Sequence, residues 1–226
     1  MVVVIDVLRA STTLVTALAH GAMEVIPCST VEEARKINRS MGREDVLLCG
    51  ERGGKKLTGF ELGNSPLQYN AKVVQGKTIV FTSTNGTRMI NLMEGGDSVF
   101  IGGFVNAKAI VDLIKDSSKD CLFACSGSDG GFSVEDAVCA GMMIEKIEEQ
   151  VGEENLYKTD EAFASQILYQ YHSSDLTGMI HNSHHGKHLK TIGFKDDLEA
   201  CVSVDVYQLV PIFKNGTIIT LHNVTG

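Results

Sequence analysis

The sequence has 226 residues, of which 43% are hydrophobic, and a formal net charge of -8. A chain of this length and apolar content can bury a substantial core. Its lysines and arginines are scattered along the chain, which argues against a nucleic-acid partner, because nucleic-acid binding needs a basic stripe or patch. An acidic protein repels anions at long range, so an anionic ligand would need local arginines, helix ends or a bound cation.

Several of the six cysteines lie in apolar stretches that are typical of buried strands, and this predicts reduced, packed thiols. The first residues, MVVVID, lack the basic region, long apolar stretch and cleavage site of a signal peptide. No apolar run approaches the length of a membrane span. We therefore expect a cytoplasmic protein with no membrane partner.

Short β-branched runs alternate with amphipathic segments along most of the chain, which is typical of strands joined by crossover helices. This pattern predicts a single α/β domain over residues 1–226, with three layers (α/β/α) and a mostly parallel or mixed central sheet. The predicted strands, in chain order, are Val2–Asp6, Glu24–Pro27, Val46–Glu51, Thr78–Thr82, Ser98–Gly102, Cys121–Ser126, Val206–Val210 and Thr217–Leu221.

Helix starts are marked by capping residues. Ser29 followed by Glu32 predicts a capping box, and Ser65 before Pro66 predicts another helix start. Their positions after predicted strands fit the alternating pattern of the chain.

Ser133 is expected to cap a long helix over Val134–Gln150, because acidic residues follow it in the first turn and apolar residues recur at helical spacing. Residues 157–200 have few strand signals and are expected to form a helical subregion.

The first candidate site is VVVIDVLRASTT, where a buried strand ends at Asp6, a turn carries Arg9, and Ser11 and Thr12 begin a helix. Free amides at a helix start can bind phosphate, and a carboxylate at a strand end can hold a hard cation. The alternative is a helix cap with a structural Asp–Arg pair.

The second candidate is TIVFTSTNGTRMI, in which a strand is followed by a polar turn that resembles an anion-binding loop. Asn85 and Gly86 readily adopt positive φ, which aims successive amides into one concavity. An Asn-Gly pair can also be an ordinary turn. The expected substrate-binding residues of this turn are Thr82, Thr84, Asn85, Gly86, Thr87 and Arg88.

The third candidate is CLFACSGSDGGFSVEDAVCAG, where a buried strand opens into a glycine-rich loop and then a helix. Ser126 and Gly127 are expected to contact substrate. Glu135 and Asp136 lie in the first helical turn, where carboxylates can bind a metal or merely stabilise the helix.

A fourth segment, GERGGKK, leaves a strand with Glu51 and Arg52 and continues to Lys55. It can supply a metal ligand and positive charge for the substrate. Its alternative is a mobile surface loop, as for many glycine-rich charged connections.

Ligands of open α/β sheets bind beyond the carboxyl ends of the strands, so these turns can converge on one crevice. The cysteine-dependent phosphatase motif, the Walker sequence and the DxD motif of haloacid-dehalogenase phosphatases are all absent from the sequence. The carboxylates instead suit Mg²⁺, which prefers oxygen ligands, and they favour metal-assisted hydrolysis. The expected metal ligands are Asp6, Glu51, Glu135 and Asp136.

A histidine cluster, His181, His184, His185 and His188, invites comparison with zinc sites, and two of its members have helical i,i+4 spacing. A structural or substrate-rim role is favoured, because no HExxH motif or cysteine partner accompanies it. Asp205 is either a supporting acid of the site or an ordinary strand-edge residue.

Taken together, IDVLRASTT, GERGG, GNSP, TSTNGT and SGSDGGFSVEDAVCAG resemble, in this order, the 2-phosphosulfolactate phosphatase family known from coenzyme M biosynthesis. The stretch from Gly186 to Pro211, with Asp197 and Cys201, is also similar to the family's ending. The resemblance implies Mg²⁺-dependent hydrolysis of 2-phospho-3-sulfolactate to 3-sulfolactate and phosphate on a three-layer α/β fold. Family members tend to have a short segment before the first strand, whereas this sequence begins directly in it, so an edge element is expected to be missing or formed differently.

On this hypothesis Asp6 and Arg9 are catalytic, and Arg9 holds phosphate together with the turns at Thr82–Thr87 and Ser126–Gly127. Positive charge for a carboxylate or sulfonate is expected from Arg52, Lys55 or Arg88. The attacking group is water or the carboxylate of Asp6.

Three alternatives remain at this point. The chain could be a phosphatase of another small 2-phosphorylated hydroxy acid, a non-catalytic protein that binds a phosphorylated metabolite, or a structural α/β subunit. The expected partners are a small anionic substrate and a second copy of the chain, as in a homodimer.

Overall fold

The computed structural model describes residues 1–42 and 44–221. Within these ranges one sheet contains the strands β1 Val2–Ile5, β2 Glu24–Cys28, β3 Val46–Arg52, β4 Lys55–Lys56, β5 Thr78–Thr82, β6 Val99–Gly102, β7 Leu122–Cys125, β8 Pro211–Lys214 and β9 Thr217–Thr220. The helices are α1 Ala10–Ala19, α2 Val31–Met41, α3 Ala71–Val74, α4 Gly86–Leu92, α5 Ala107–Lys115, α6 Val134–Val151, α7 Asp160–His172, α8 Leu176–Asn182, α9 His184–Thr191 and α10 Lys195–Cys201.

The strands lie in the order β4-β3-β5-β2-β9-β8-β6-β1-β7. Two parallel groups, β3-β5-β2 and β6-β1-β7, are joined by the antiparallel β8–β9 hairpin, so the sheet is mixed. Ile5 pairs with Gly102 and Cys125, and Thr82 pairs with Gly50 and Cys28. Within each parallel group the strands therefore end level with one another, and the turns that follow them start together.

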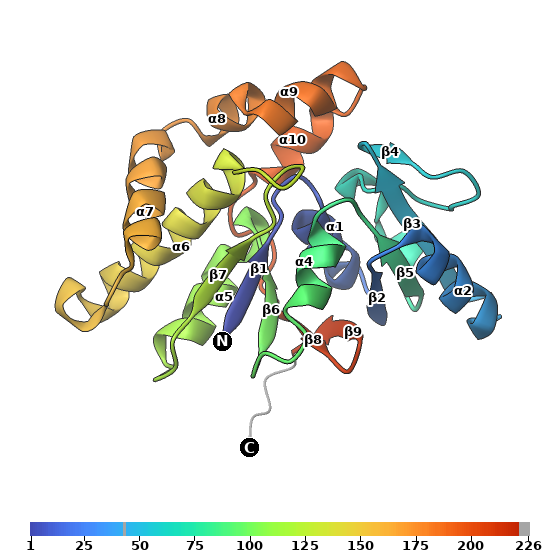
Figure 1. Cartoon of the computed structure of the whole chain (residues 1–226), viewed down its shortest axis with the longest axis horizontal. Coiled ribbons are helices and arrows are strands. Elements are labelled where there is room, and N and C mark those ends of the chain that lie inside the picture. Colours follow the sequence, from blue (N-terminus) through green and yellow to red (C-terminus); the bar gives the residue numbers. More distant parts are fainter. Residues whose placement is uncertain (43, 222–226) are drawn as a thin grey trace.

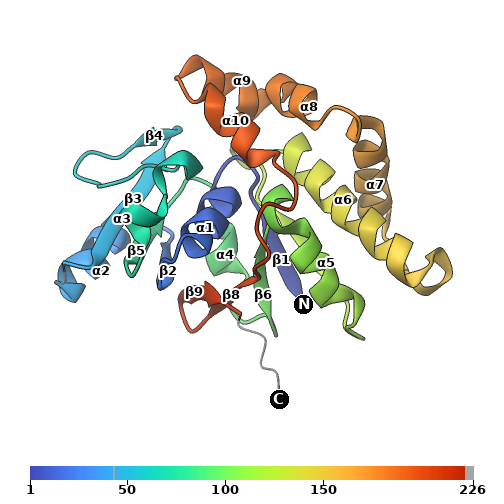
Figure 2. The same cartoon turned by 180° about the vertical axis from the view of Figure 1, so that it is seen from behind.

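Alternating residues of β1 pack against helices on opposite faces of the sheet. Val3 and Ile5 lie in a core cluster with α5 and α6, whereas Val4 lies in a second cluster with α1 and α4. A third cluster packs α2 against β2, β3 and β5. These layers confirm the α/β class, and Figures 1 and 2 show the helices on the two sides of the sheet. All six cysteines are free thiols, as expected.

Four helices follow one another between Asp160 and Cys201. The first of them, α7, packs along α6, and α8, α9 and α10 continue across the end of the sheet at which β1 and β7 finish (Figure 1, top). Residues distant in the sequence from the strand-to-helix turns thereby lie next to them.

The strand predicted at Val206–Val210 is wrong, because β8 begins only at Pro211. The amides of Asp205 and Tyr207 donate to the carbonyls of Phe104 and Val105, each at 2.9 Å. The segment is therefore held against the 3-10 turn after β6 instead of joining the sheet.

Two predicted caps differ from the structure. Thr30, not Ser29, caps α2, since its hydroxyl accepts from the amide of Glu33 at 3.1 Å and the carboxylate of Glu33 accepts from the Ser29 amide. The predicted box of Ser29 and Glu32 is therefore not formed, since Thr30 caps the helix and Glu33 bonds the amide of the residue before the cap. Ser65 precedes a 3-10 turn, Pro66–Gln68, and makes no cap bond there.

Ser133 caps α6 as predicted, since its hydroxyl accepts from the Asp136 amide at 3.3 Å. The helix extends over Val134–Val151 and ends at Gly152. Asp136 is thereby fixed in the first turn of a long buried helix.

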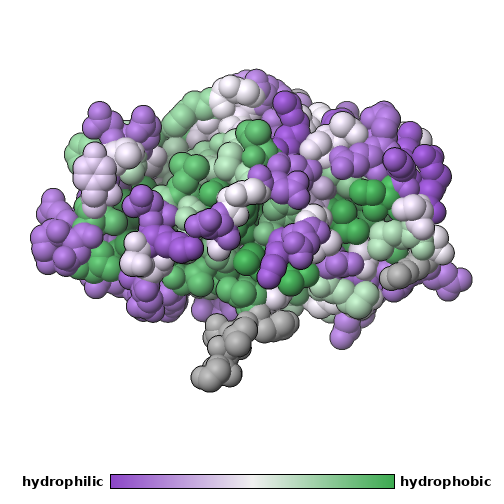
Figure 3. All heavy atoms as spheres, turned by 60° about the horizontal axis from the view of Figure 1, so that its bottom comes forward, coloured by the Kyte–Doolittle hydropathy of each residue, from purple (hydrophilic) through white to green (hydrophobic). Residues whose placement is uncertain are grey.

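Apolar and charged side chains are mixed on the surface. Figure 3 shows this on the bottom face, where hydrophobic residues (green) lie among hydrophilic ones (purple). Leu122 and Ile219 are among the large apolar side chains that remain exposed. None of the helices in the described part of the chain has the length and apolar character needed to cross a membrane.

The contact between α6 and α7 depends on Gly141. A Cβ atom there would lie 2.0 Å from the carbonyl oxygen of Ser165. Gly→Ala inside a helix ordinarily stabilises by about 0.5–1 kcal/mol, but we expect Gly141→Ala to destabilise the protein by roughly 1–3 kcal/mol, because the helices must move apart. Urea denaturation measures the change.

Gly103→Ala is the matched control. Its backbone is extended and its nearest neighbour would be 3.8 Å from an added Cβ, so the free energy of unfolding should change by less than about 0.5 kcal/mol. A Gly141→Ala protein as stable as the wild type would contradict this account of the α6–α7 contact.

Candidate active site

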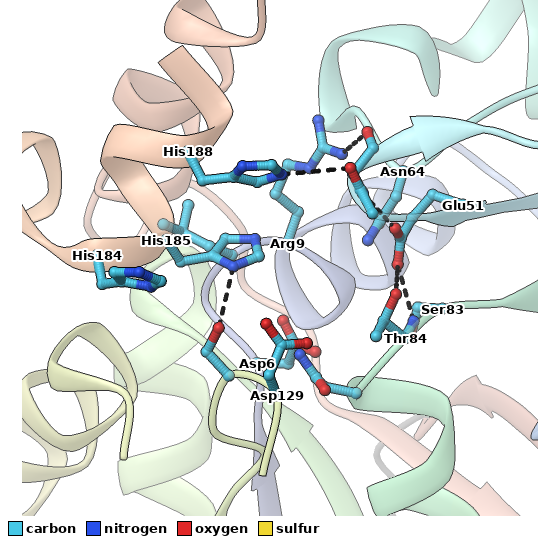
Figure 4. A pocket seen from close by; sticks show the side chains of 15 residues that line it. Asp6, Arg9, Glu51, Asn64, Ser83, Thr84, Asp129, His184, His185 and His188 are labelled. Atoms are coloured by element: carbon cyan, nitrogen blue, oxygen red, sulfur yellow. Dashed lines mark hydrogen bonds between the residues drawn. The ribbon is translucent and has the colours of Figure 1, made fainter. Parts of the chain in front are cut away.

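A cavity of about 120 Å³ lies beyond the carboxyl ends of β1, β3, β5 and β7, with α9 on its other side (Figure 4). Its size suits a small molecule. It is lined by Asp6, Leu8, Arg9, Glu51, Gly53, Gly54, Asn64, Ser83, Thr84, Asn85, Ser128, Asp129, His184, His185 and His188. The four segments that the sequence singles out therefore all contribute to one cavity.

Asp6 follows β1 directly and is bonded to the start of α1. Its Oδ1 accepts from the Ala10 amide at 3.1 Å, and its carbonyl accepts from the Ser11 amide at 2.9 Å. The Ser11 hydroxyl accepts from the Asp6 amide, and the Thr12 hydroxyl donates to the Val7 carbonyl. The expectation that the first amides of this helix are free for phosphate is thus wrong, because Asp6 occupies them, and Ser11 and Thr12 are turned toward the backbone.

Gly86 lets the turn after β5 approach Asp6. A Cβ at this position would lie 2.5 Å from Oδ2 of Asp6 and 2.5 Å from the Cβ of Ala10. Only glycine can bring the start of α4 this close to the carboxylate. Ser83 and Thr87 stabilise the same turn, since each accepts the other's amide through its hydroxyl, at 3.0 and 3.1 Å.

Asp136 joins the turn after β1 to the turn after β7. Its Oδ1 accepts from the Val7 amide at 2.8 Å, and its Oδ2 accepts from the Gly127 amide at 3.1 Å. The side chain does not line the cavity, and neither does its neighbour Glu135, although both are buried.

Three buried carboxyl groups, those of Asp6, Glu135 and Asp136, have raised pKa values. Burial raises the pKa of Asp6 to about 7, with Glu51 and Glu135 adding repulsion and the Ala10 amide opposing the rise. Burial and the charge of Asp6 raise the pKa of Asp136, and burial raises the pKa of Glu135. The site is therefore short of positive charge.

The side chain of Glu51 joins the turn after β3 to the turn after β5 by hydrogen bonds. Its Oε1 accepts from the amide and hydroxyl of Thr84, at 2.8 and 3.0 Å, and its Oε2 accepts from the Gly54 amide at 2.7 Å. The GERGGKK segment is consequently a β-hairpin between β3 and β4, not a loose surface loop.

Arg9 is buried and engaged on three sides. Its Nη1 donates to Asp197 Oδ2 at 2.6 Å, its Nη2 donates to the Gly54 carbonyl at 2.7 Å, and its guanidinium lies 4.3 Å from the centre of the Phe194 ring. Ser65 donates to the other oxygen of Asp197 at 2.7 Å. Arg9 lines the cavity, but both of its terminal nitrogens already hold α10 and the β3–β4 turn in place.

Two other predicted cations do not line the cavity. Arg52 donates to the Thr82 hydroxyl and to the Glu51 carbonyl. Arg88 is exposed in a neighbouring groove, which it shares with Asn85 and Ser126. The remaining predicted contact residues Thr82, Gly86, Thr87 and Gly127 shape the turns without lining the cavity, and Lys55 is exposed on β4.

Three members of the predicted histidine cluster line the cavity from α9. Nδ1 of His185 lies 3.3 Å from the Ser128 hydroxyl, and Nε2 of His188 lies 3.3 Å from the Gly53 carbonyl. His181 does not line the cavity and bonds Glu199 instead. Asp205 also lies outside the lining and pairs with Lys146.

Asn64 and Asp129 line the cavity but were not among the residues predicted for it, whereas Ser83 belongs to the turn Thr82–Thr87 that was expected to hold phosphate. The Thr13 hydroxyl donates to the Asn64 carbonyl, while Oδ1 of the buried Asn64 side chain has no hydrogen-bond partner among the described residues. The motif GNSP could have indicated Asn64, because it supplies an oxygen ligand within one of the motifs that carry the family resemblance.

The oxygen donors of the cavity fit Mg²⁺. Asp6 and the unpartnered Asn64 Oδ1 are both hard ligands, and Arg9, the permanent cation of the lining, is already bonded to Asp197 and Gly54. Across residues 1–42 and 44–221, no three His, Cys, Asp or Glu side chains form a complete metal site. Mg²⁺ does not require one, since it commonly binds one or two carboxylates together with waters and substrate phosphate.

The raised pKa of Asp6 predicts that the free energy of unfolding depends on pH when a chelator keeps the protein free of metal. The pKa of Asp6 is about 7 in the folded protein and 3.8 in its absence, so the fold favours the protonated form of this side chain. This contribution to stability is fully present below about pH 4 and is lost as the pH rises through 7. We expect the melting temperature of Asp6→Asn to exceed that of the wild type at pH 8 by on the order of 5 °C, and to match it near pH 4. Parallel pH profiles of the two proteins would contradict the assignment.

The sequence matches the family model described as 2-phosphosulpholactate phosphatase over residues 1–216. A protein of Caldanaerobacter subterraneus subsp. tengcongensis named "Probable 2-phosphosulfolactate phosphatase" is 40% identical over 219 residues, which cover 97% of this chain and 90% of that protein.

Two further relatives carry the same name. The Thermotoga petrophila protein is 40% identical over 218 residues, covering 96% of this chain and 90% of the relative. The Clostridium acetobutylicum protein is 38% identical over 217 residues, covering 96% and 91%. The match extends through every segment that contributes to the cavity, and the chain therefore belongs to the 2-phosphosulpholactate phosphatase family.

Proposed function

We propose that the protein is a Mg²⁺-dependent phosphatase that hydrolyses 2-phospho-3-sulfolactate to 3-sulfolactate and inorganic phosphate. The observation that carries this proposal is the buried group of mutually repelling carboxyls beside a small cavity, in a chain of this family. A site that binds a polyanion next to such carboxyls needs a cation between them.

Asp6 and Asn64 are the proposed ligands of Mg²⁺, since both residues line the cavity, both side chains carry an oxygen donor, and Oδ1 of Asn64 has no hydrogen-bond partner among the described residues. Glu135 and Asp136 are proposed to act through their negative charge and through water, because neither lines the cavity. Bound there, Mg²⁺ would polarise the phosphoryl oxygens and neutralise charge that develops in the transition state.

The turn after β5 is the proposed phosphate-binding element. Thr84 lies in it with its amide and hydroxyl committed to Glu51, so the turn is rigid, and Ser83 and Asn85 present polar groups to the cavity. A pre-formed turn stabilises a transition state without the cost of ordering it during the reaction.

We further propose that water attacks the phosphorus directly. The carboxylate of Asp6 accepts from the Ala10 amide through one oxygen and lies against Gly86 through the other, which suits a fixed ligand better than an attacking nucleophile.

The metal and Asp6 are tested together by phosphate release from 2-phosphosulfolactate. We expect chelation of Mg²⁺, and separately Asp6→Asn, to lower kcat/KM by at least about 100-fold. Asp205→Asn is the control, because it removes a carboxylate that pairs with Lys146 outside the cavity. Tight binding of the substrate without hydrolysis would instead identify a metabolite-binding protein, and preferential hydrolysis of phosphoglycolate would identify a different substrate.

The attacking group is tested with a thiophosphate analogue of the substrate, made chiral at phosphorus by sulfur and two oxygen isotopes and hydrolysed in water that carries the third isotope, so that the released thiophosphate is chiral. Direct attack by water in line with the leaving group inverts the configuration, and this is the expected result. Retention, together with a phosphoryl-enzyme trapped by acid quench in the wild type but not in Asp6→Asn, would show that Asp6 is the nucleophile.

A further inference from the structure

The cavity has few groups that can bind the acidic end of a substrate. Asp6, Glu51 and Asp129 are the acids of its lining, and Arg9 is the lining residue with a permanent positive charge. Both terminal nitrogens of Arg9 are already bonded, and its side chain and that of Asp197 are only 1% and 3% exposed. Arg9 therefore has little capacity left for a second anion beside the phosphate.

The three histidines of α9 are a further source of N–H donors to an anion, beside the side-chain amides of Asn64 and Asn85. His184 and His188 are one helical turn apart, and the rings of His185 and His188 have their centres 6.0 Å apart. In Figure 4 they lie on one side of the cavity, above Asp6 in this view. The histidines thus face Asp6 across the cavity, and His184 also lies within reach of the charge of the buried Glu135.

The rings are held in place but keep nitrogen atoms for a ligand. Ser128 fixes His185 through Nδ1, and Gly53 fixes His188 through Nε2, so Nε2 of the former and Nδ1 of the latter are left over. The exposed ring of His184 lines the cavity beside them. His185 Nε2 can donate to an anion when Ser128 donates to its Nδ1. Because His188 Nε2 donates to the Gly53 carbonyl, Nδ1 of His188 can donate to an anion only in the imidazolium form.

We propose that His184, His185 and His188 form the subsite for the sulfonate of the substrate, an inference that rests on the proposed phosphatase function. The phosphate, on the second carbon of the substrate, is held near Asp6 and the turn after β5. The sulfonate, on the third carbon, then points toward α9. Since a sulfonate stays ionised throughout the working pH range, its removal from water must always be offset by donors or positive charge.

This subsite would set the choice among 2-phosphorylated hydroxy acids. 2-Phospholactate has the same phosphate and carboxylate as 2-phosphosulfolactate but a methyl group in place of the sulfonate-bearing carbon. The ratio of kcat/KM for the two substrates therefore isolates recognition of the sulfonate. We expect this ratio to be at least about 10 in the wild type, as for the loss of hydrogen bonds to a charged group.

The test measures that ratio in His184→Ala, His188→Ala and His185→Phe, the last of which keeps a ring but removes its nitrogens. Each single change is expected to lower the ratio about 3- to 10-fold, and the triple change to bring it close to 1, with kcat/KM for 2-phospholactate preserved. His181→Ala, on α8 and bonded to Glu199 outside the cavity, is the matched control and should leave the ratio unchanged.

Two results would overturn the subsite. An equal loss of kcat/KM for both substrates would show that the histidines bind the phosphate or stabilise the fold. An unchanged ratio would show that they do not contact the sulfonate. Collapse of the ratio in Arg88→Ala, with the histidine variants unaffected, would place the sulfonate in the neighbouring groove.

Calorimetric titration with 3-sulfolactate, against lactate as the reference ligand, separates this inference from the phosphatase function. If the wild type binds 3-sulfolactate and the triple histidine variant does not, the subsite is supported even when neither phosphorylated substrate is hydrolysed. Equal binding to the wild type and the triple variant, or none to either, counts against it even if hydrolysis occurs.

Discussion

Hydrogen bonds from backbone amides to buried carboxylates hold the turns of the site together. Asp6 bonds the start of α1, Asp136 joins the turns after β1 and β7, and Glu51 joins the turns after β3 and β5. Because these carboxylates accept from amides of other turns, the turns are positioned by one another and not only by the sheet. The same turns bury Asp6 and Asp136, where desolvation and neighbouring carboxyl groups raise their pKa, and this supports the Mg²⁺ proposed above.

Local chemistry in the sequence was sufficient for much of the fold. Apolar runs located the parallel strands, and Ser133 with its acidic neighbours located the start of α6. The prediction failed where a tertiary contact decided the outcome. The segment at Val206–Val210 is rich in strand-forming residues, but its amides bond the turn at Phe104 and Val105. No local pattern in that segment reveals this partner.

The segments of the site were predictable, but the role of each side chain was not. A turn rich in glycine and hydroxyl groups indicates polar chemistry after a strand, yet it does not tell whether a hydroxyl faces a ligand or the backbone, as Ser11 and Thr12 do. Arg9 was recognisable as a buried cation only with its partner Asp197, which lies far along the chain. Asn64 and the histidines of α9 reach the cavity through segments that the strand-to-helix rule does not cover.

The β8–β9 hairpin, formed from a late part of the chain, lies in the middle of the sheet, where Ile218 pairs with Val25 and Phe213 pairs with Val99. During synthesis on a ribosome the two parallel groups would emerge with unpaired inner edges, at β2 and β6, until this hairpin arrives. Such edges are templates for pairing with other chains. Nascent molecules should therefore be most exposed to misassociation in the interval between the translation of β6 and that of β9, long after the turn that carries Asp6 has been made.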